Sequence, residues 1–476
     1  MSRKRSQPFF CWAHLYDPHA PYSAHADMFG DAFADPYDAE IAYVDMQIGR
    51  LVDFLRKQGL ESQTLVVVVG DHGEGLSEHV ERAHGITLYN STMHVPLIFR
   101  QSGRLPPGRL VPANLSLVDV APTILSLAGV TDAQTAGVSF EAALLGGDAP
   151  SLLRCYGLTD EPFLVNGWAP LQCLTEGHWK YIRTTRVELY DLAADPHERH
   201  NLADARPDKL REMEVRLADV ESRMVRRDEV SSQLTPTEIR KLEALGYLGA
   251  GGPARTGPVP AHLPDVKDML PFDNEVQDAV NLAHEGALDQ AIERLQTVIR
   301  KAPSCVQAYQ LLGDMLRVKS DFDEASNVFR SLLEIRPEAR NAHFGLGNVF
   351  LAQGRIDEAK IEFLKELEIN PELAEAHYNL AAICANTGQA DEALAHFDAA
   401  LEINSRYVAA YLARADLLAR LGRMPEAIGD WKDALKCDPN ASQTHQRLGV
   451  VLANRGDAQE ALRHLSRAVE LNPRNA

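Results

Sequence analysis

Two potential metal ligands stand side by side in the segment Gly70-Asp71-His72-Gly73-Glu74-Gly75. A carboxylate supplies negative charge and a neutral imidazole supplies a directed lone pair, so the two suit a divalent cation. They directly follow residues 64–69, an apolar, β-branched run that predicts a strand buried on both faces. Because open α/β sheets bind ligands beyond the carboxyl ends of their strands, we predict that Asp71 and His72 hold a metal ion. A glycine-rich turn without a ligand is the alternative.

The predicted strand follows an amphipathic helix. Apolar residues at Val44, Ile48, Leu51 and Leu55 recur with helical spacing. A helix that leads into a buried strand is typical of an α/β domain with a parallel sheet. We therefore expect that fold class for the first part of the chain.

Six ordered segments in the first half of the chain resemble the sulfatase family, within the alkaline-phosphatase-like superfamily. They are residues 9–22, 39–51, 70–85, 116–125, 179–183 and 188–202. The resemblance implies the carboxyl-terminal portion of a sulfatase domain over residues 1–248, with Asp71 and His72 as ligands of the active-site cation. It does not distinguish Ca²⁺, Mn²⁺, Mg²⁺ and Zn²⁺. His72 stands where many arylsulfatases have Asn, so the implied reaction is hydrolysis of sulfate esters or of phosphate or phosphonate esters.

The same resemblance gives roles to two more histidines. His19, in the motif Asp17-Pro-His-Ala-Pro, matches a residue on the leaving-group side that can act as general acid, a role that suits imidazole. His84, twelve residues beyond His72, stands where relatives often carry a Lys that touches the substrate anion. A turn residue and an exposed loop residue are the respective alternatives. Glu74 and His79 are weaker candidates.

A complete family member also carries an acidic metal-binding strand and a nucleophile motif, Cys-x-Pro/Ala-x-Arg or its Ser form. The cysteine of that motif becomes formylglycine. The nearest segment here, Cys11-Trp-Ala-His-Leu15, has Leu15 in place of the arginine. Since ester hydrolysis of this kind needs the nucleophile, we expect the chain to be truncated and inactive alone. A mis-set start, a split enzyme with a partner chain, and a non-catalytic scaffold with a degenerate sulfatase domain are the three explanations.

A 34-residue period runs through residues 272–476. One column holds only alanine, namely Ala291, Ala325, Ala359, Ala393, Ala427 and Ala461. Four positions later stands a bulky apolar column, namely Leu295, Phe329, Phe363, Phe397, Trp431 and Leu465. These columns resemble the tetratricopeptide repeat. They imply an all-α solenoid of six repeats that packs them as core and binds a protein or peptide partner.

Residues 249–271 are predicted to be a linker, because glycine and proline are frequent at 249–264. The formal net charge of -19 disfavours nucleic acid and anionic membrane surfaces as partners. Six cysteines without a C-x-x-C pair indicate neither a zinc site nor a disulfide framework. No apolar run has the length of a membrane span or a signal peptide. The localisation stays open, although sulfatases are often periplasmic or exported.

Overall fold

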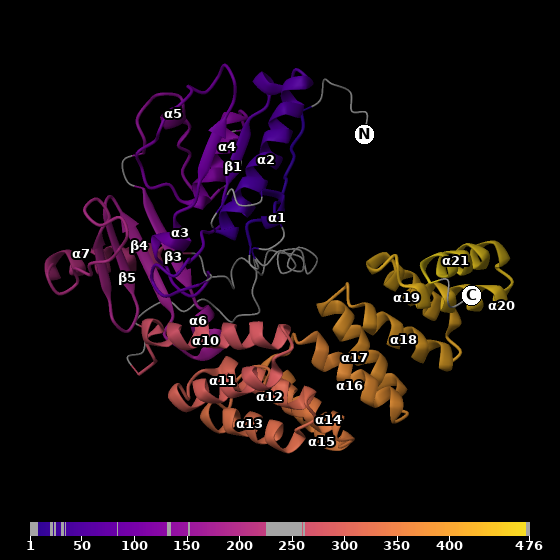
Figure 1. Ribbon diagram of the computed structural model, residues 1–476. Coiled ribbons are helices and arrows are strands. Elements are labelled where there is room, and N and C mark those ends of the chain that lie inside the picture. The colour runs from indigo at the N-terminus through magenta and orange to yellow at the C-terminus, as the bar shows by residue number, and fades with distance from the viewer. Residues whose placement is uncertain are drawn as a thin grey trace. The chain divides into compact units, whose positions relative to one another are not determined.

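The computed structural model describes residues 8–472 apart from 20–21, 23–24, 30–32, 34, 83, 131–134, 151–152, 225–258 and 260–261 (Figure 1). The chain divides into two compact units. The front unit comprises Met1–Thr159 and Pro170–Arg223. The repeat unit comprises Asp160–Ala169 and Met224–Ala476. Most of the predicted linker lies outside the described residues.

The front unit is built from helices and six strands among its described residues. In chain order these elements are α1 (Ala26–Phe29), α2 (Pro36–Lys57), η2 (Glu61–Gln63), β1 (Val66–Val69), α3 (Asn90–Met93), β2 (Leu97–Arg100), η3 (Leu117–Asp119), α4 (Val120–Leu127), α5 (Glu141–Leu144), β3 (Arg154–Thr159), β4 (Leu171–Glu176), β5 (Trp179–Arg183), β6 (Glu188–Asp191) and α7 (Pro207–Ser222). The predicted helix before the strand is α2, which starts with Pro36 and is capped by Asp35, whose side chain accepts a hydrogen bond from Tyr37 N at 2.9 Å.

The strand that precedes Asp71 is β1, and its pairing differs from the expectation. Among the described strands β1 pairs with β2, and the pairing is antiparallel, so the predicted parallel neighbour is wrong for this strand. The predicted burial on both faces is also wrong, since Val69 is 40% and Ile98 of β2 is 54% exposed. An apolar run indicates a strand but carries no information on the direction of its neighbour. The predicted sequence of classes, an α/β region followed by a helical array, is confirmed.

A second sheet, of order β3-β4-β5-β6, is antiparallel throughout. Helix α7 packs on it, and the shared core contains Leu174, Tyr181, Leu189, Met213 and Leu217.

The segment around residue 198 is tied to this sheet by a buried ion pair. Lys180 Nζ lies 2.6 Å from Glu198 Oε1, and both side chains are 1% exposed. The other oxygen of Glu198 accepts a hydrogen bond from Asn90 N at 2.6 Å. These contacts fix the chain that leads from the site loop to β2.

The repeat unit contains α6 and twelve consecutive helices among its described residues. They are α6 (Glu161–Asn166), α10 (Val266–His284), α11 (Leu288–Lys301), α12 (Val306–Val318), α13 (Phe322–Ile335), α14 (Ala342–Ala352), α15 (Ile356–Ile369), α16 (Ala374–Asn386), α17 (Ala390–Ile403), α18 (Val408–Arg420), α19 (Met424–Cys437), α20 (Ser442–Arg455) and α21 (Ala458–Leu471). From α10 onward successive helices pack in six pairs, α10 with α11 through α20 with α21. Helix α10 begins at Val266, inside the residues that the sequence assigns to the linker.

The alanine and aromatic columns form the core of the array. All six alanines are at most 3% exposed, and Phe329, Phe363 and Phe397 are buried to the same degree. Small residues let the helices approach, because a Cβ on Gly313 would lie 2.5 Å from the ring of Phe329. Within the described residues, no helix has both the length and the apolar character needed to cross a membrane.

Candidate functional site

The loop after β1 is held in place by a close backbone approach. Gly73 N donates a hydrogen bond to Thr92 O at 2.7 Å, and a Cβ on Gly73 would lie 2.1 Å from Ser91 O. Only glycine fits between these two segments, which explains its place beside the predicted ligands. Asp71 and His72 therefore stand on a loop that is anchored directly after them.

Asp71 and His72 point their polar atoms into the same region. Asp71 Oδ1 accepts a hydrogen bond from His72 N at 3.0 Å and lies 3.9 Å from His72 Nε2. His72 Nδ1 lies 2.9 Å from Gly73 O, so Nδ1 carries the proton and donates it to this carbonyl. The lone pair of the ring is then on Nε2. Metal-binding histidines are commonly oriented by such a bond from the other ring nitrogen. The donor set fits a divalent cation that receives further ligands from outside this pair.

His84 connects the two predicted parts of the site. Its ring stacks on His72 with a centroid separation of 3.9 Å, and it meets His19 edge to face at 5.5 Å. Its Nδ1 lies 3.0 Å from Glu74 Oε1, and the Glu74 side chain is 4% exposed. The structure thus brings all four residues predicted for the site, His19, Asp71, His72 and His84, into one cluster.

Two tyrosines surround the buried carboxylate of Glu74. Burial raises the pKa of Tyr22, and so does the negative charge of Glu74. Burial and the negative charge of Glu74 also raise the pKa of Tyr37. Both phenols therefore stay protonated around neutral pH and can donate hydrogen bonds.

His19 is oriented by a neighbour on its own loop. Tyr16 stacks on it with ring centroids 4.5 Å apart, and Tyr16 OH lies 3.1 Å from His19 Nδ1. The sequence interpretation did not assign Tyr16 to the site. The spacing of three residues between Tyr16 and His19 is the only signal that could have indicated it. The weaker candidate His79 lies apart from this cluster of contacts, with Nε2 at 3.1 Å from His197 O and its ring stacked on Tyr89.

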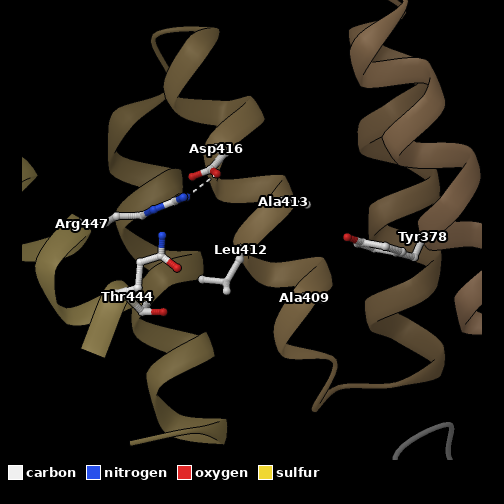
Figure 2. Close-up of a pocket in the computed structure, with 8 residues that line it drawn as sticks. Tyr378, Ala409, Leu412, Ala413, Asp416, Thr444 and Arg447 are labelled. Carbon is white, nitrogen blue, oxygen red and sulfur yellow. Dashed lines mark hydrogen bonds and ion pairs between the residues drawn. The ribbon is translucent and has the colours of Figure 1, made fainter. Parts of the chain in front are cut away.

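The repeat unit carries a groove on the first helices of successive hairpins. Its lining residues are Tyr378 of α16, Ala409, Leu412, Ala413 and Asp416 of α18, and Gln443, Thr444 and Arg447 of α20. Arg447 Nη1 donates to Asp416 Oδ2 at 2.5 Å across the groove, and Tyr378 faces the pair from the other side (Figure 2). The groove therefore offers an apolar floor with a charged rim.

Comparison with protein families supports both parts of the chain. Residues 1–130 match the family described as Sulfatase, and residues 85–223 match N-sulphoglucosamine sulphohydrolase, C-terminal. Matches to Tetratricopeptide repeat families cover residues 282–325, 318–373, 372–438 and 412–476.

Curated relatives match the front part. Arylsulfatase K of Xenopus laevis is 30% identical over 195 residues, which are 39% of this chain and 36% of that protein. Choline-sulfatase of Rhizobium meliloti is 32% identical over 177 residues, which are 35% of this chain and 32% of that protein. The chain thus spans about a third of the length of these relatives.

Solved structures match the repeat part. YrrB, described as a TPR protein with an unusual peptide-binding site, is 24% identical, with a TM-score of 0.32 and coverage of 38% of this chain and 93% of its own. Pseudomonas aeruginosa pilF is 18% identical, with a TM-score of 0.39 and coverage of 43% and 92%.

Residues 1–223 therefore match two sulfatase family models, in agreement with the ordered motifs. The chain joins this segment to an array of tetratricopeptide repeats.

Proposed function

We propose that the front unit supplies the metal-binding and leaving-group side of a sulfate-ester hydrolase site. The observation that carries the proposal is the cluster in which His84 stacks on His72 and meets His19. The imidazoles of His19, His72 and His84 and the carboxylate of Asp71 lie in one cluster, although they come from separate stretches of the sequence. The named relatives, an arylsulfatase and a choline-sulfatase, favour sulfate esters over phosphate or phosphonate esters.

Each residue has a role that its contacts support. A divalent cation bound by Asp71 and His72 would offset the negative charge of the ester group. His19, whose Nδ1 lies 3.1 Å from the Tyr16 hydroxyl, would protonate the leaving oxygen as general acid. His84, held through Nδ1 by Glu74, has Nε2 left to donate to an anionic oxygen of the substrate.

Metal binding tests the proposal on the intact chain. Isothermal titration with Ca²⁺, Mn²⁺, Mg²⁺ and Zn²⁺ should show a bound ion that is lost in Asp71→Asn and in His72→Gln. Asp53→Asn removes the same charge from an exposed position of α2 and should leave that ion in place. Equal binding by Asp71→Asn and the unmodified chain would reject the assigned ligands and leave the scaffold interpretation ahead.

Turnover is a separate question, because sulfatase chemistry also needs a nucleophile. The printed sequence has no Cys-x-Pro/Ala-x-Arg motif. We therefore expect no hydrolysis of p-nitrophenyl sulfate or of p-nitrophenyl phosphonate esters by residues 1–476 alone. Hydrolysis that disappears in Asp71→Ala would contradict this expectation and indicate another nucleophile.

A second proposed function belongs to the repeat unit, which we infer binds a peptide in the groove between α16, α18 and α20. The apolar floor at Leu412 and the Asp416–Arg447 pair can hold a side chain together with a polar backbone group. Ala409 is exposed in the groove, so Ala409→Arg fills it without disturbing the core. Binding in a peptide array should be lost in Ala409→Arg and retained in Leu462→Arg, a change at an exposed position of α21. Unchanged binding in Ala409→Arg would exclude this groove.

A further inference from the structure

A third group of potential ligands lies in the front unit, formed by Asp17, His25 and Glu40. One oxygen or nitrogen atom from each side chain lies within 4.8 Å of the others. Glu40 stands in the second turn of α2, whereas Asp17 and His25 come from the chain before that helix. None of the three belongs to the cluster around Asp71 and His72.

The two distances from His25 to the carboxylates are those of ligands around an ion. His25 Nε2 lies 3.6 Å from Asp17 Oδ2 and 3.6 Å from Glu40 Oε2. Both separations exceed the 2.7–3.2 Å range that is ordinary for an N–H···O hydrogen bond, and one N–H cannot point at two carboxylates. Two ligands bound tetrahedrally at zinc distances are about 3.4 Å apart. The observed separations match that value.

Glu40 supplies a buried oxygen that has no hydrogen-bond partner. The residue is 1% exposed, and its Oε1 accepts a hydrogen bond from His25 N at 3.1 Å. Its Oε2, which is the atom that faces His25 Nε2, makes no hydrogen bond. A buried carboxylate oxygen without a partner is unfavourable unless a cation or another donor meets it.

The ring of His25 is fixed by stacking on Tyr43 of α2, with centroids 3.6 Å apart and planes inclined by 18°. The Glu40 carboxylate is thus held by the backbone N–H of His25, and the His25 ring is held by Tyr43, which lies on the same helix as Glu40. Mutual positioning of this kind prepares ligands before the ion binds.

We propose that Asp17, His25 and Glu40 bind a divalent cation of the Zn²⁺ type, distinct from the ion assigned to Asp71 and His72. One imidazole nitrogen with two carboxylate oxygens suits a first-row metal better than Mg²⁺ or Ca²⁺, which prefer oxygen ligands. Three protein ligands leave a coordination position for water. The exposed fractions of the Asp17 and His25 side chains, 31% and 18%, give solvent access to that position.

Such an ion would join the loop before α1 to the first turns of α2. Asp17 is only two residues before His19, so the ion would also restrict the loop that carries the proposed general acid. The site is therefore a positioning site, and it does not depend on whether the front unit hydrolyses esters.

The test uses the full chain with Asp71→Ala and His72→Ala, so that the other proposed ion is removed. After treatment with a chelator, titration with Zn²⁺ should show one remaining ion, and Co²⁺ in its place should give the visible absorption of a tetrahedral site. Glu40→Gln, His25→Gln and Asp17→Asn should each weaken Zn²⁺ binding by at least about tenfold. Asp38→Asn, an exposed carboxylate two residues from Glu40 on α2, is the matched control and should bind as before.

Folding is checked separately, because Glu40 is buried. Zn²⁺ should raise the melting temperature of the parent, which is the chain with Asp71→Ala and His72→Ala, and that of its Asp38→Asn variant. It should not raise that of the Asp17→Asn variant. The Asp17 side chain is partly exposed, so misfolding is a poor explanation for such a result. Absence of a Zn²⁺ ion in the parent would overturn the proposal. Undiminished Zn²⁺ binding in both Asp17→Asn and His25→Gln would overturn it as well, because the ion would then be bound by other residues.

Discussion

Histidine pairs recur in the repeat unit at a spacing of 19 residues. The Nδ1 atoms of His377 and His396 lie 3.1 Å apart, and those of His445 and His464 lie 2.9 Å apart. In each pair Nε2 of the first ring faces a proline carbonyl, at 3.2 Å from Pro371 O for His377. The proton of His377 is then on Nε2, and its Nδ1 accepts the Nδ1–H of His396. Protonation of both rings would place two donors against each other.

The pairs predict a pH dependence of stability. Burial lowers the pKa of His377, and burial together with the neighbouring His377 lowers that of His396, although Glu392 opposes the shift. The unfolded chain therefore binds more protons than the folded one just below the ordinary imidazole range of about 6.5, so this stability is present above that pH and is lost as the pH falls. The free energy of unfolding, measured with urea, should be lower at pH 5.5 than at pH 7.5. In His396→Gln this difference should be smaller, by up to about 1 kcal/mol.

The control for this experiment is His284→Gln, an exposed histidine at the end of α10. It should leave the pH dependence of the unfolding free energy unchanged. A His396→Gln variant with the same pH dependence as the unmodified chain would contradict the role of the pair.

Sequence patterns indicated the candidate residues of the site more readily than the contacts that these residues make. Asp71 and His72 follow a recognisable strand, and His19 and His84 stand in motifs that the family shares. The buried carboxylate of Glu74 and the stacking of Tyr16 on His19 could not be predicted with the same ease. Burial of Glu74 depends on tertiary packing, which a local motif does not encode.

At the scale of elements, the repeat register was predictable because each 34-residue unit repeats the same packing. The direction in which β1 pairs was not, because residues 64–69 form an apolar run without alternation. Close approaches between helices were predictable only in part. Gly345 stands outside the alanine and bulky apolar columns, so the repeat pattern did not indicate it. A Cβ on Gly345 would lie 2.3 Å from the ring of Phe329 at its Cε1 edge, and the opposite edge, at Cε2, meets Gly313.

The position of Phe329 between two glycines predicts the cost of a single methyl group. The ring is fully buried and cannot move away from Gly345 without meeting Gly313. Gly345→Ala should therefore lower the free energy of unfolding by about 1–3 kcal/mol, measured by urea denaturation. Gly429→Ala is the matched control, since Gly429 lies within α19 with no atom near its Cβ position, and this change should stabilise by about 0.5–1 kcal/mol. A stabilising Gly345→Ala would disprove the tight crossing.

At the scale of the whole molecule, the division of the chain does not follow the order of the sequence. Asp160–Ala169 stands between strands β3 and β4 in the chain, yet it belongs to the repeat unit. Asn166, at the end of α6, places its Oδ1 3.0 Å from Gln307 N at the start of α12. The residue at the cap of α12, Cys305, makes no capping bond of its own. Neither periodicity nor a family motif indicated this segment, because its contacts span 141 residues of sequence.

Asn166 therefore acts as the missing cap of α12, and its removal should open that end of the helix. We expect Asn166→Ala to lower the stability of the repeat unit by about 0.5–2 kcal/mol. Hydrogen exchange followed by mass spectrometry on the full chain should show faster exchange of the Gln307 amide and its neighbours. Val165→Ala, which shortens a side chain that is 38% exposed on the same helix, should leave that exchange unchanged. Equal protection of the Gln307 amide in Asn166→Ala and the unmodified chain would show that Asn166 does not act as the cap of α12.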